Sequence, residues 1–378
     1  MRVLQFGRFW NEQYGGVERH VALLGKGLAA QGIDVVNLVA NVGLPSRDET
    51  AARYQLIQAW SFGMAFGTAL SPALVLKALA LHRQEPFDLF HLHFPDPLSH
   101  LTSMMLPRNV PRVITWHSEI VRQKRLLALY KPFLRRITRQ ADALVAATQS
   151  HFDASTQIPK DIPANRRHVI PYGLDYEPLA LSPRTTALRD NLRARAHGRG
   201  LVFALGRHVY YKGFDVLIEA MQHTRAFLIL GGDGSLRPQL EQQAAAMGVS
   251  DRVFFSGRIP EEDLAAYFNA CDVFCLPSVE PSEAFGLVQL EAMACGKPVV
   301  CTQLNNGVNV VNVHGKTGFA VPVRDPVALG LCLARLLQDD ALRQKLGKQA
   351  LAHTRSYSVP AMTASHLKLY QDLLGTSR

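Results

Sequence analysis

Short apolar runs alternate with helical patterns along almost the whole chain, and this alternation restricts the fold more than any other feature. The runs that we expect as strands fall in two series, at residues 2–6, 34–39, 89–93, 112–116, 143–147 and 167–170, and then at 201–205, 226–230, 252–256, 273–277, 298–301 and 318–321. Continuously apolar strands separated by helices are typical of parallel sheets that are covered on both faces. The sequence therefore predicts an α/β protein with two doubly wound, Rossmann-like domains.

A polar, arginine-rich stretch separates the two series. We predict an N-terminal domain at residues 1–172, a linker at 173–198 and a C-terminal domain at 199–359. We expect the last helical pattern, residues 360–378, to pack back on the first domain. The chain has 378 residues, enough for two cores. Two such domains facing each other would leave a ligand cleft between the carboxyl ends of their strands.

The net charge of +10 limits the classes of partner. A positive field attracts phosphates, nucleic acid or an anionic membrane surface. The chain lacks a basic stripe interleaved with aromatic residues in a known motif, so we expect no nucleic-acid partner. A basic nucleic-acid-binding protein is the non-enzyme alternative.

Two further observations bear on the compartment. Five cysteines lie in the C-terminal half without a Cys-x-x-Cys pair, so we expect buried free thiols in a reducing cytoplasm. The N-terminus reads as a strand rather than a signal segment. Residues 59–81 are fairly apolar, but glycines and Pro72 interrupt them, and we interpret them as a loop and a short helix rather than a membrane span.

The strongest local signal is the segment 276–298, which reads LPSVEPSEAFGLVQLEAMACGKP. It predicts a strand, a loop and a helix that begins near Gly286. Unpaired amides at a helix N-terminus suit a diphosphate, and a glycine there allows close approach to the backbone. Glu283 and Glu291 bracket this helix start. Carboxylates are better suited to hydroxyls than to phosphate, so we expect Glu283 on the sugar side and Glu291 on the ribose side.

The Glu-x7-Glu pattern, with Phe285, Gly286, Leu287 and Val288 inside it and EAMACGKPVV at its end, resembles the signature of retaining glycosyltransferases of the GT-B fold, family 4. The resemblance implies an enzyme that transfers a sugar from a nucleotide-diphosphate donor and needs no cofactor besides that substrate. It also implies retention by front-face substitution, in which the departing phosphate helps to deprotonate the acceptor.

Arg207 and Lys212 follow the first strand of the second series. A guanidinium fork and an ammonium can neutralise a diphosphate. The resemblance implies that these two residues hold the donor diphosphate and stabilise the departing nucleotide. The sequence contains no Asp-x-Asp motif, so we expect no metal ion.

The remaining candidates come from strand ends. The resemblance implies that the turn at Gly15 and Gly16 closes over the diphosphate, and that His117 contacts the sugar. Gly232 and Asp233 end another strand, where the glycine allows close approach to the donor and Asp233 is equally suited to cap the next turn. Arg258 lies where the base pocket is expected. His91 and His93 also end a strand, and we assign neither a catalytic role. The predicted catalytic residues are His117, Glu283, Arg207 and Lys212.

The segment from Val121 to Gln140 is basic and amphipathic. It fits a helix on an anionic membrane, or an ordinary helix with its apolar face on the core. The first interpretation implies a lipid-linked saccharide acceptor at the inner membrane face. Residues 116–124, WHSEIVRQK, resemble bacterial O-antigen transferases, which implies GDP-mannose or GDP-rhamnose as donor. A UDP-sugar-dependent transferase, and an epimerase or phosphorylase of similar fold, are the alternatives.

Overall fold

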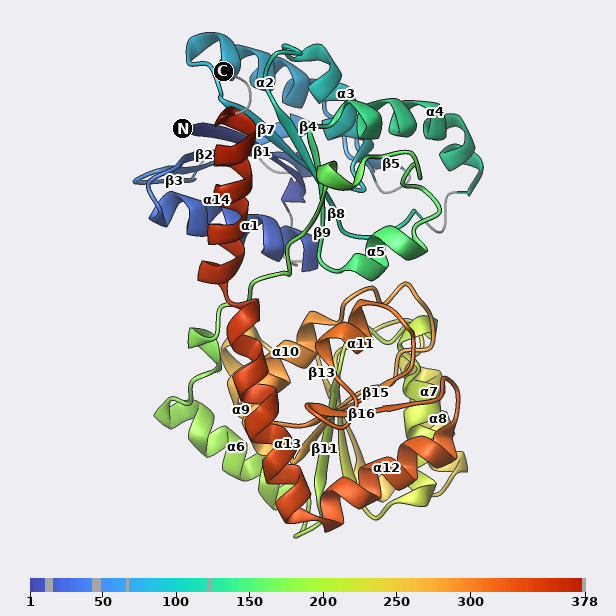
Figure 1. Cartoon of the computed structure of the whole chain (residues 1–378). Coiled ribbons are helices and arrows are strands. Elements are labelled where there is room, and N and C mark those ends of the chain that lie inside the picture. The colour runs from blue at the N-terminus through green and yellow to red at the C-terminus, as the bar shows by residue number, and fades with distance from the viewer. Residues whose placement is uncertain (11–15, 43–48, 66–67, 121–123, 376–378) are drawn as a thin grey trace. The chain divides into compact units, whose positions relative to one another are not determined.

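The computed structural model describes residues 1–10, 16–42, 49–65, 68–120 and 124–375. The chain forms two compact units (Figure 1). Unit 1 comprises Met1–Gly173 and Ser358–Arg378, and unit 2 comprises Leu174–Tyr357. The chain therefore passes between the units twice, and the C-terminal segment belongs to the unit that contains the N-terminus.

Unit 1 is built on an eight-stranded sheet with the order β10-β9-β8-β7-β1-β2-β4-β3. All neighbours are parallel except β3 and β4. The strands are β1 Arg2–Trp10, β2 Asp34–Val42, β3 Glu49–Ala51, β4 Tyr54–Ser61, β7 Leu89–Phe94, β8 Arg112–Trp116, β9 Ala143–Ala146 and β10 Arg167–Val169, and a separate hairpin consists of β5 Met64–Ala65 and β6 Thr68–Ala69.

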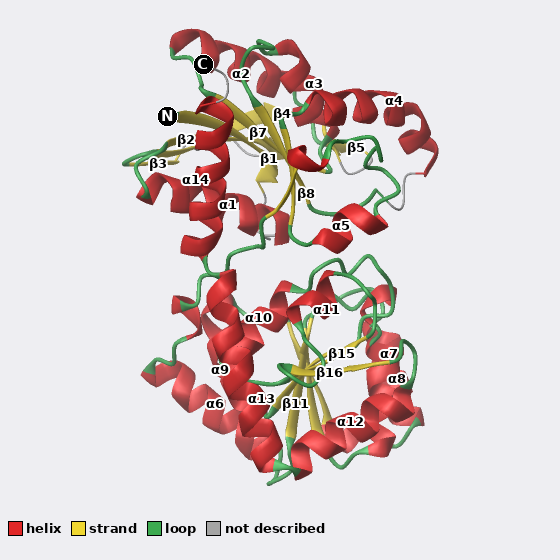
Figure 2. Ribbon diagram, viewed as in Figure 1, coloured by secondary structure: helices red, strands yellow, loops and turns green. Residues whose placement is uncertain are grey.

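Helices cover both faces of this sheet (Figure 2). They are α1 Gly16–Ala30, α2 Pro72–Gln84, α3 Pro97–Met105, α4 Lys124–Gln140, α5 Gln149–Ala154 and α14 Val359–Gly375. Side chains alternate between the faces: Leu4 and Phe6 pack in the core with α2 and α4, whereas Val3 packs in the core with α1 and α14. Strand β1 therefore contributes apolar side chains to a core on each face of the sheet, as its apolar run predicts.

Unit 2 contains a six-stranded, fully parallel sheet with the order β13-β12-β11-β14-β15-β16. Its strands are β11 Leu201–Leu205, β12 Phe227–Gly231, β13 Val253–Gly257, β14 Val273–Leu276, β15 Val299–Thr302 and β16 Gly318–Val321. Its helices are α6 Pro183–Arg195, α7 Phe214–Ala220, α8 Arg237–Ala246, α9 Leu264–Ala270, α10 Leu287–Ala294, α11 Gly307–Val311, α12 Pro326–Gln338 and α13 Asp340–His353. Helices α6, α9 and α10 lie on one side of the sheet, and α7, α8 and α12 on the other (Figure 2).

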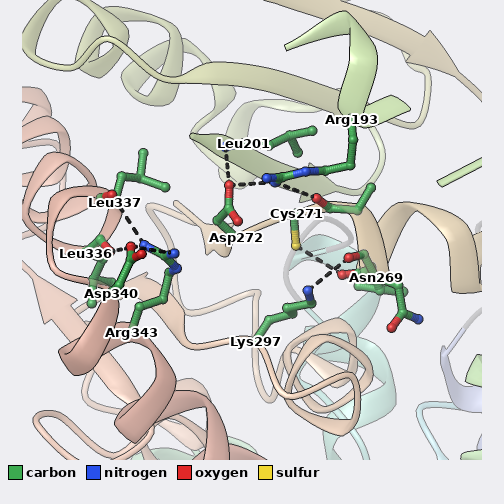
Figure 3. A network of polar contacts seen from close by, with 12 residues as sticks. Arg193, Leu201, Asn269, Cys271, Asp272, Lys297, Leu336, Leu337, Asp340 and Arg343 are labelled. Carbon is green, nitrogen blue, oxygen red and sulfur yellow. Dashed lines mark hydrogen bonds and ion pairs between the residues drawn. The ribbon is translucent and has the colours of Figure 1, made fainter. Parts of the chain in front are cut away.

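The expected linker at 173–198 is wrong, because all of it after Gly173 belongs to unit 2, where α6 packs on α9. A capping box between Ser182 and Thr185 begins this helix. Near its end, Arg193 Nη1 donates to Asp272 Oδ2 at 2.7 Å, and the same oxygen accepts from the Leu201 N–H at 2.7 Å (Figure 3). One carboxylate thus ties α6 to the first strand of the sheet.

The stretch 59–81 was predicted as a loop and a short helix, and the helix is confirmed, because α2 begins at Pro72. The predicted loop is wrong, since this part of the chain contains the end of β4 and the β5–β6 hairpin. Ser71 caps α2, and its side chain accepts a hydrogen bond from the Leu74 N–H. Among the described residues, no helix has the length and apolar character needed to cross a membrane.

Candidate functional site

The central strands of unit 2, β11 and β14, carry the main candidates on the loops that follow them. Arg207 and Lys212 come after β11, and Glu283 comes after β14. The two strands are neighbours in the sheet, so their carboxyl ends lie side by side. The Val279 N–H donates to the Tyr211 carbonyl at 2.8 Å and ties one loop to the other.

Lys212 and Glu283 form an ion pair, with Nζ 2.5 Å from Oε2. Each side chain is only 12 % exposed. The structure therefore brings together two of the four predicted catalytic residues, 71 positions apart in the sequence. Arg207 is exposed at the same strand end.

Three residues that the sequence analysis did not select position Glu283. Ser278 donates its hydroxyl to Glu283 Oε2 at 3.0 Å, and Asn306 Nδ2 donates to the Glu283 carbonyl at 2.8 Å. The Thr302 hydroxyl donates to the Ser278 carbonyl, which links β15 to the same loop. Ser278 lies inside the motif segment, but the sequence contains no signal that pairs Asn306 with Glu283.

Helix α10 begins after Gly286, which has φ +70° and therefore the left-handed conformation that favours glycine. Leu287 and Val288 form its first turn and are partly exposed. Phe285, by contrast, is 4 % exposed and lies 6.1 Å, centroid to centroid, from the ring of Tyr357. Its side chain thus belongs to the core of unit 2. Glu291 is buried in the second turn of α10.

Gly232 and Asp233 follow β12, the strand on the other side of β11. Gly232 has φ +103°, and a Cβ atom there would lie 2.0 Å from the Gly206 carbonyl oxygen, so the two strand ends meet backbone to backbone. Asp233 Oδ1 accepts from the Gly234 N–H at 2.8 Å. Its carboxylate therefore takes the turn-capping role that the sequence analysis considered. Arg258 follows the edge strand β13 and is exposed.

The candidates of unit 1 lie at the carboxyl ends of its strands as well. Gly16 is the exposed first residue of α1, and Gly15 lies outside the described residues. His117 directly follows β8 and is buried, and its backbone N–H donates to the Phe94 carbonyl at 3.1 Å. Helix α1 thus begins, and β8 ends, at the same edge of the sheet.

Both ring nitrogens of His117 have protein partners. Nε2 shares a hydrogen bond of 3.0 Å with His93 Nδ1, and Nδ1 shares one of 2.8 Å with the Tyr172 hydroxyl. Burial and the neighbouring imidazole of His117 hold the pKa of His93 well below its usual range. A sugar that contacts His117 must therefore replace one of these partners. The sequence analysis gave His93 no catalytic role and did not select Tyr172.

Comparisons with known proteins show the family of the chain. Residues 190–353 match the family described as Glycosyl transferases group 1, and residues 14–178 match Glycosyltransferase Family 4. The D-rhamnosyltransferase WbpZ of Pseudomonas aeruginosa is 32 % identical over 362 residues, which cover 94 % of this chain and 91 % of that protein. The chain belongs to glycosyltransferase family 4.

Two more comparisons extend the likeness of this family 4 glycosyltransferase over its full length. The O-antigen chain mannosyltransferase C of Escherichia coli is 27 % identical over 381 residues, which cover 99 % of each chain. The crystal structure of Anabaena Alr3699/HepE in complex with UDP and glucose superposes with a TM-score of 0.76 and 21 % identity, over 98 % of this chain and 100 % of that one. The predicted GT-B fold and the glycosyltransferase activity are thus confirmed.

The carboxyl edge of the sheet in unit 2 has groups that are suited to an anion. An ammonium, an exposed guanidinium and a helix N-terminus come from adjoining strand ends, and each attracts negative charge. An anion that binds Lys212 would compete with Glu283 for the ammonium group. The carboxylate of Glu283 would then be free to accept other hydrogen bonds.

Proposed function

We propose that this glycosyltransferase is retaining and metal-independent, and that it moves mannose or rhamnose from a GDP-sugar onto a lipid-linked saccharide during surface-polysaccharide (O-antigen) synthesis. Two relatives matched over nearly their whole length, a D-rhamnosyltransferase and an O-antigen chain mannosyltransferase, support this donor and pathway class. The likeness to a structure that holds UDP and glucose supports the alternative of a UDP-sugar donor.

The single observation that carries the proposal is the buried contact between Lys212 and Glu283 beside the start of α10. In the proposed complex, Lys212 and Arg207 bind the diphosphate together with the first amides of α10. Glu283, released from Lys212 but still held by Ser278 and Asn306, accepts hydrogen bonds from hydroxyls of the transferred sugar. Because this exchange of partners occurs when the donor binds, charge that develops on the departing phosphate is stabilised without further reorganisation of the site during the reaction.

His117 contacts the sugar in this proposal, after one of its present partners gives way. The two ring hydrogen bonds of His117 go to His93 and Tyr172, neither of which is a carboxylate. We propose front-face substitution, with the departing phosphate oxygen accepting the proton of the acceptor hydroxyl. The product then keeps the anomeric configuration of the donor. Proton NMR of the newly formed linkage measures this directly, and an inverted anomer contradicts the mechanism.

The substitution Glu283→Gln tests how the donor is held. We expect transfer to fall by about 10²–10³-fold, the usual effect of losing one group that stabilises the transition state. Nucleoside diphosphate should still raise the melting temperature of the variant, because the diphosphate no longer competes with the Glu283 carboxylate for Lys212. The additional rise in melting temperature that the nucleotide sugar gives over the nucleoside diphosphate should become smaller. Glu280→Gln, three residues earlier in the same loop, is the control. Equal activity of the Glu283 variant and the control would refute the assignment.

Helix α4 supports a contact with the membrane surface. Part of its apolar side packs on the core, where Leu134 and Ile137 are buried, whereas Leu129 and Phe133 are 75 % and 54 % exposed. Arg136 lies on the exposed face, one turn beyond Phe133. Cations next to exposed apolar side chains fit an anionic lipid surface, so we propose peripheral attachment at the cytoplasmic face.

Vesicle co-sedimentation tests this attachment. We expect binding to vesicles rich in phosphatidylglycerol, weaker binding at high salt, and little binding to phosphatidylcholine vesicles. The double variant L129S/F133S should lose most of the binding. V327S/L331S is a matched control, since these two exposed residues lie on α12 of unit 2. Equal loss in both double variants, or none in either, contradicts the role of α4.

A further inference from the structure

Three buried histidines of unit 1 converge at the carboxyl edge of its sheet, and the proposed transfer uses only His117. His20 comes from α1, His93 from β7, and His117 from the residue after β8. One ring nitrogen from each lies within 4.8 Å of those from the other two, and all three side chains are buried. We propose that this triad binds a divalent transition-metal ion of the zinc class.

The spacing of the nitrogens fits such an ion. His93 Nδ1 and His117 Nε2 are 3.0 Å apart. Two nitrogen ligands of one tetrahedral zinc ion lie about 3.3 Å apart, given bonds of about 2.0–2.1 Å. A small displacement therefore converts the hydrogen bond between the two rings into two bonds to a shared metal. His20, whose ring centroid is 5.0 Å from that of His117 and 5.7 Å from that of His93, supplies the third ligand.

Unpaired ring nitrogens provide a second, independent observation. Within the described part of the chain, neither nitrogen of His20 has a hydrogen-bond partner, and His93 Nε2 has none. His20 is only 3 % exposed. A buried polar group without a partner destabilises the fold, because it has lost its hydrogen bonds to water. A metal bond to His20 would remove part of this cost.

The surroundings select the class of ion. Tyr172 lies 2.8 Å from His117 Nδ1 and can hold that ring with Nε2 directed at the metal, as outer partners of metal-bound histidines do. Three imidazoles favour Zn²⁺, Co²⁺ or Ni²⁺ over the oxygen-seeking Mg²⁺ and Ca²⁺. Three protein ligands leave a fourth position open for water or another ligand. This proposal departs from the expectation, based on the sequence, that the chain holds no metal.

The site lies in unit 1, whereas the predicted diphosphate ligands Arg207 and Lys212 lie in unit 2. With Nε2 on the metal and Nδ1 on Tyr172, neither ring nitrogen of His117 would be free to contact the sugar. The metal should therefore inhibit transfer rather than support it, a consequence that rests on the proposed function. The binding measurements below do not depend on that function.

Titration of the chelator-treated full-length protein with Co²⁺ tests the proposal. We expect one Co²⁺ per chain, with the intense visible absorption of a tetrahedral site, displaced by Zn²⁺ and unaffected by Mg²⁺. His20→Phe keeps the ring and removes the ligand, so Co²⁺ affinity should fall at least 100-fold. His100→Phe is the matched control, because His100 is another buried histidine of unit 1 outside the triad, and its Co²⁺ affinity should be unchanged.

The tyrosine provides a second variant in case His20→Phe does not fold. Tyr172→Phe should weaken Co²⁺ binding by about 10–100-fold, the usual effect of removing an outer partner of a metal ligand. A wild-type protein that shows no stoichiometric Co²⁺ absorption overturns the proposal. So does a folded His20→Phe protein that binds Co²⁺ as tightly as the wild type.

Discussion

Acidification should destabilise unit 1 through its buried histidines, and His100 gives the most direct measurement. Burial lowers the pKa of His100 from 6.5 to about 3. The folded protein therefore keeps this imidazole neutral at pH 5, whereas the unfolded chain binds a proton below pH 6.5. The contribution of neutral, buried His100 to the free energy of unfolding is fully present above pH 6.5, and it is lost as the pH falls toward 3. Between pH 7 and pH 5, the loss for this residue is about 2 kcal/mol, or 1.5 pKa units at 1.36 kcal/mol each.

Tryptophan fluorescence can follow this unit alone, because the three tryptophans, at positions 10, 60 and 116, all belong to unit 1. Urea unfolding at pH 7 and pH 5, with chelator present, gives the free energy of unfolding at each pH. The wild type should lose more stability than His100→Phe does on acidification, by about 2 kcal/mol. Other buried histidines titrate in both proteins, so the difference isolates His100. Identical pH dependence in the two proteins would refute the assigned pKa and the burial argument behind it.

Two further predictions concern unit 2. Gly286→Ala should reduce stability by about 1–2 kcal/mol, because an L-residue at φ +70° is strained, and it should weaken nucleoside diphosphate binding measured by calorimetry. Unchanged nucleoside diphosphate binding would contradict a contact between Gly286 and the donor. Asp272→Ala removes the acceptor of the buried Leu201 N–H and should cost about 1–3 kcal/mol in urea unfolding followed by circular dichroism, whereas a neutral result would show that α6 does not depend on this carboxylate.

The strands with uninterrupted apolar runs were predictable, and β8, β11 and β16 have the predicted bounds, whereas β3 to β6 were not predicted. Helix α6 was not, since only Thr185 and Leu192 of its thirteen residues are buried, and two buried residues make no periodic apolar stripe. Its stability comes from a capping box and from Arg193, which reaches Asp272 across 79 positions. A contact at such a separation leaves no local pattern in the sequence.

In the candidate site as well, local features could be predicted from the sequence, whereas contacts between distant residues could not. Glu283 and Gly286 lie in a segment with a recognisable motif, and Lys212 lies in a basic turn, so each could be selected from its neighbours in the sequence. The contact between Lys212 and Glu283 could not be predicted from the local sequence, because the ion pair depends on β11 and β14 lying next to each other. Asn306 was missed as a partner of Glu283 for the same reason.

The strand order explains why the candidates lie where they do in both units. In unit 2 the order runs outward from β11 to β12 and β13, and from β14 to β15 and β16 in the other direction. The connections after β11 and β14 therefore diverge at a switch point, and open α/β sheets bind ligands outside the carboxyl ends of their strands at such points. Lys212 and Glu283 flank that point.

In unit 1 the order reverses between β1 and β7. Helix α1 follows the first of these strands and carries His20, and the second ends near His93. Parallel strands at a switch point thus bring together residues that the sequence keeps far apart. This topology predicts a ligand-binding edge in each unit without reference to any motif, so the histidine triad is found where the fold itself favours a ligand.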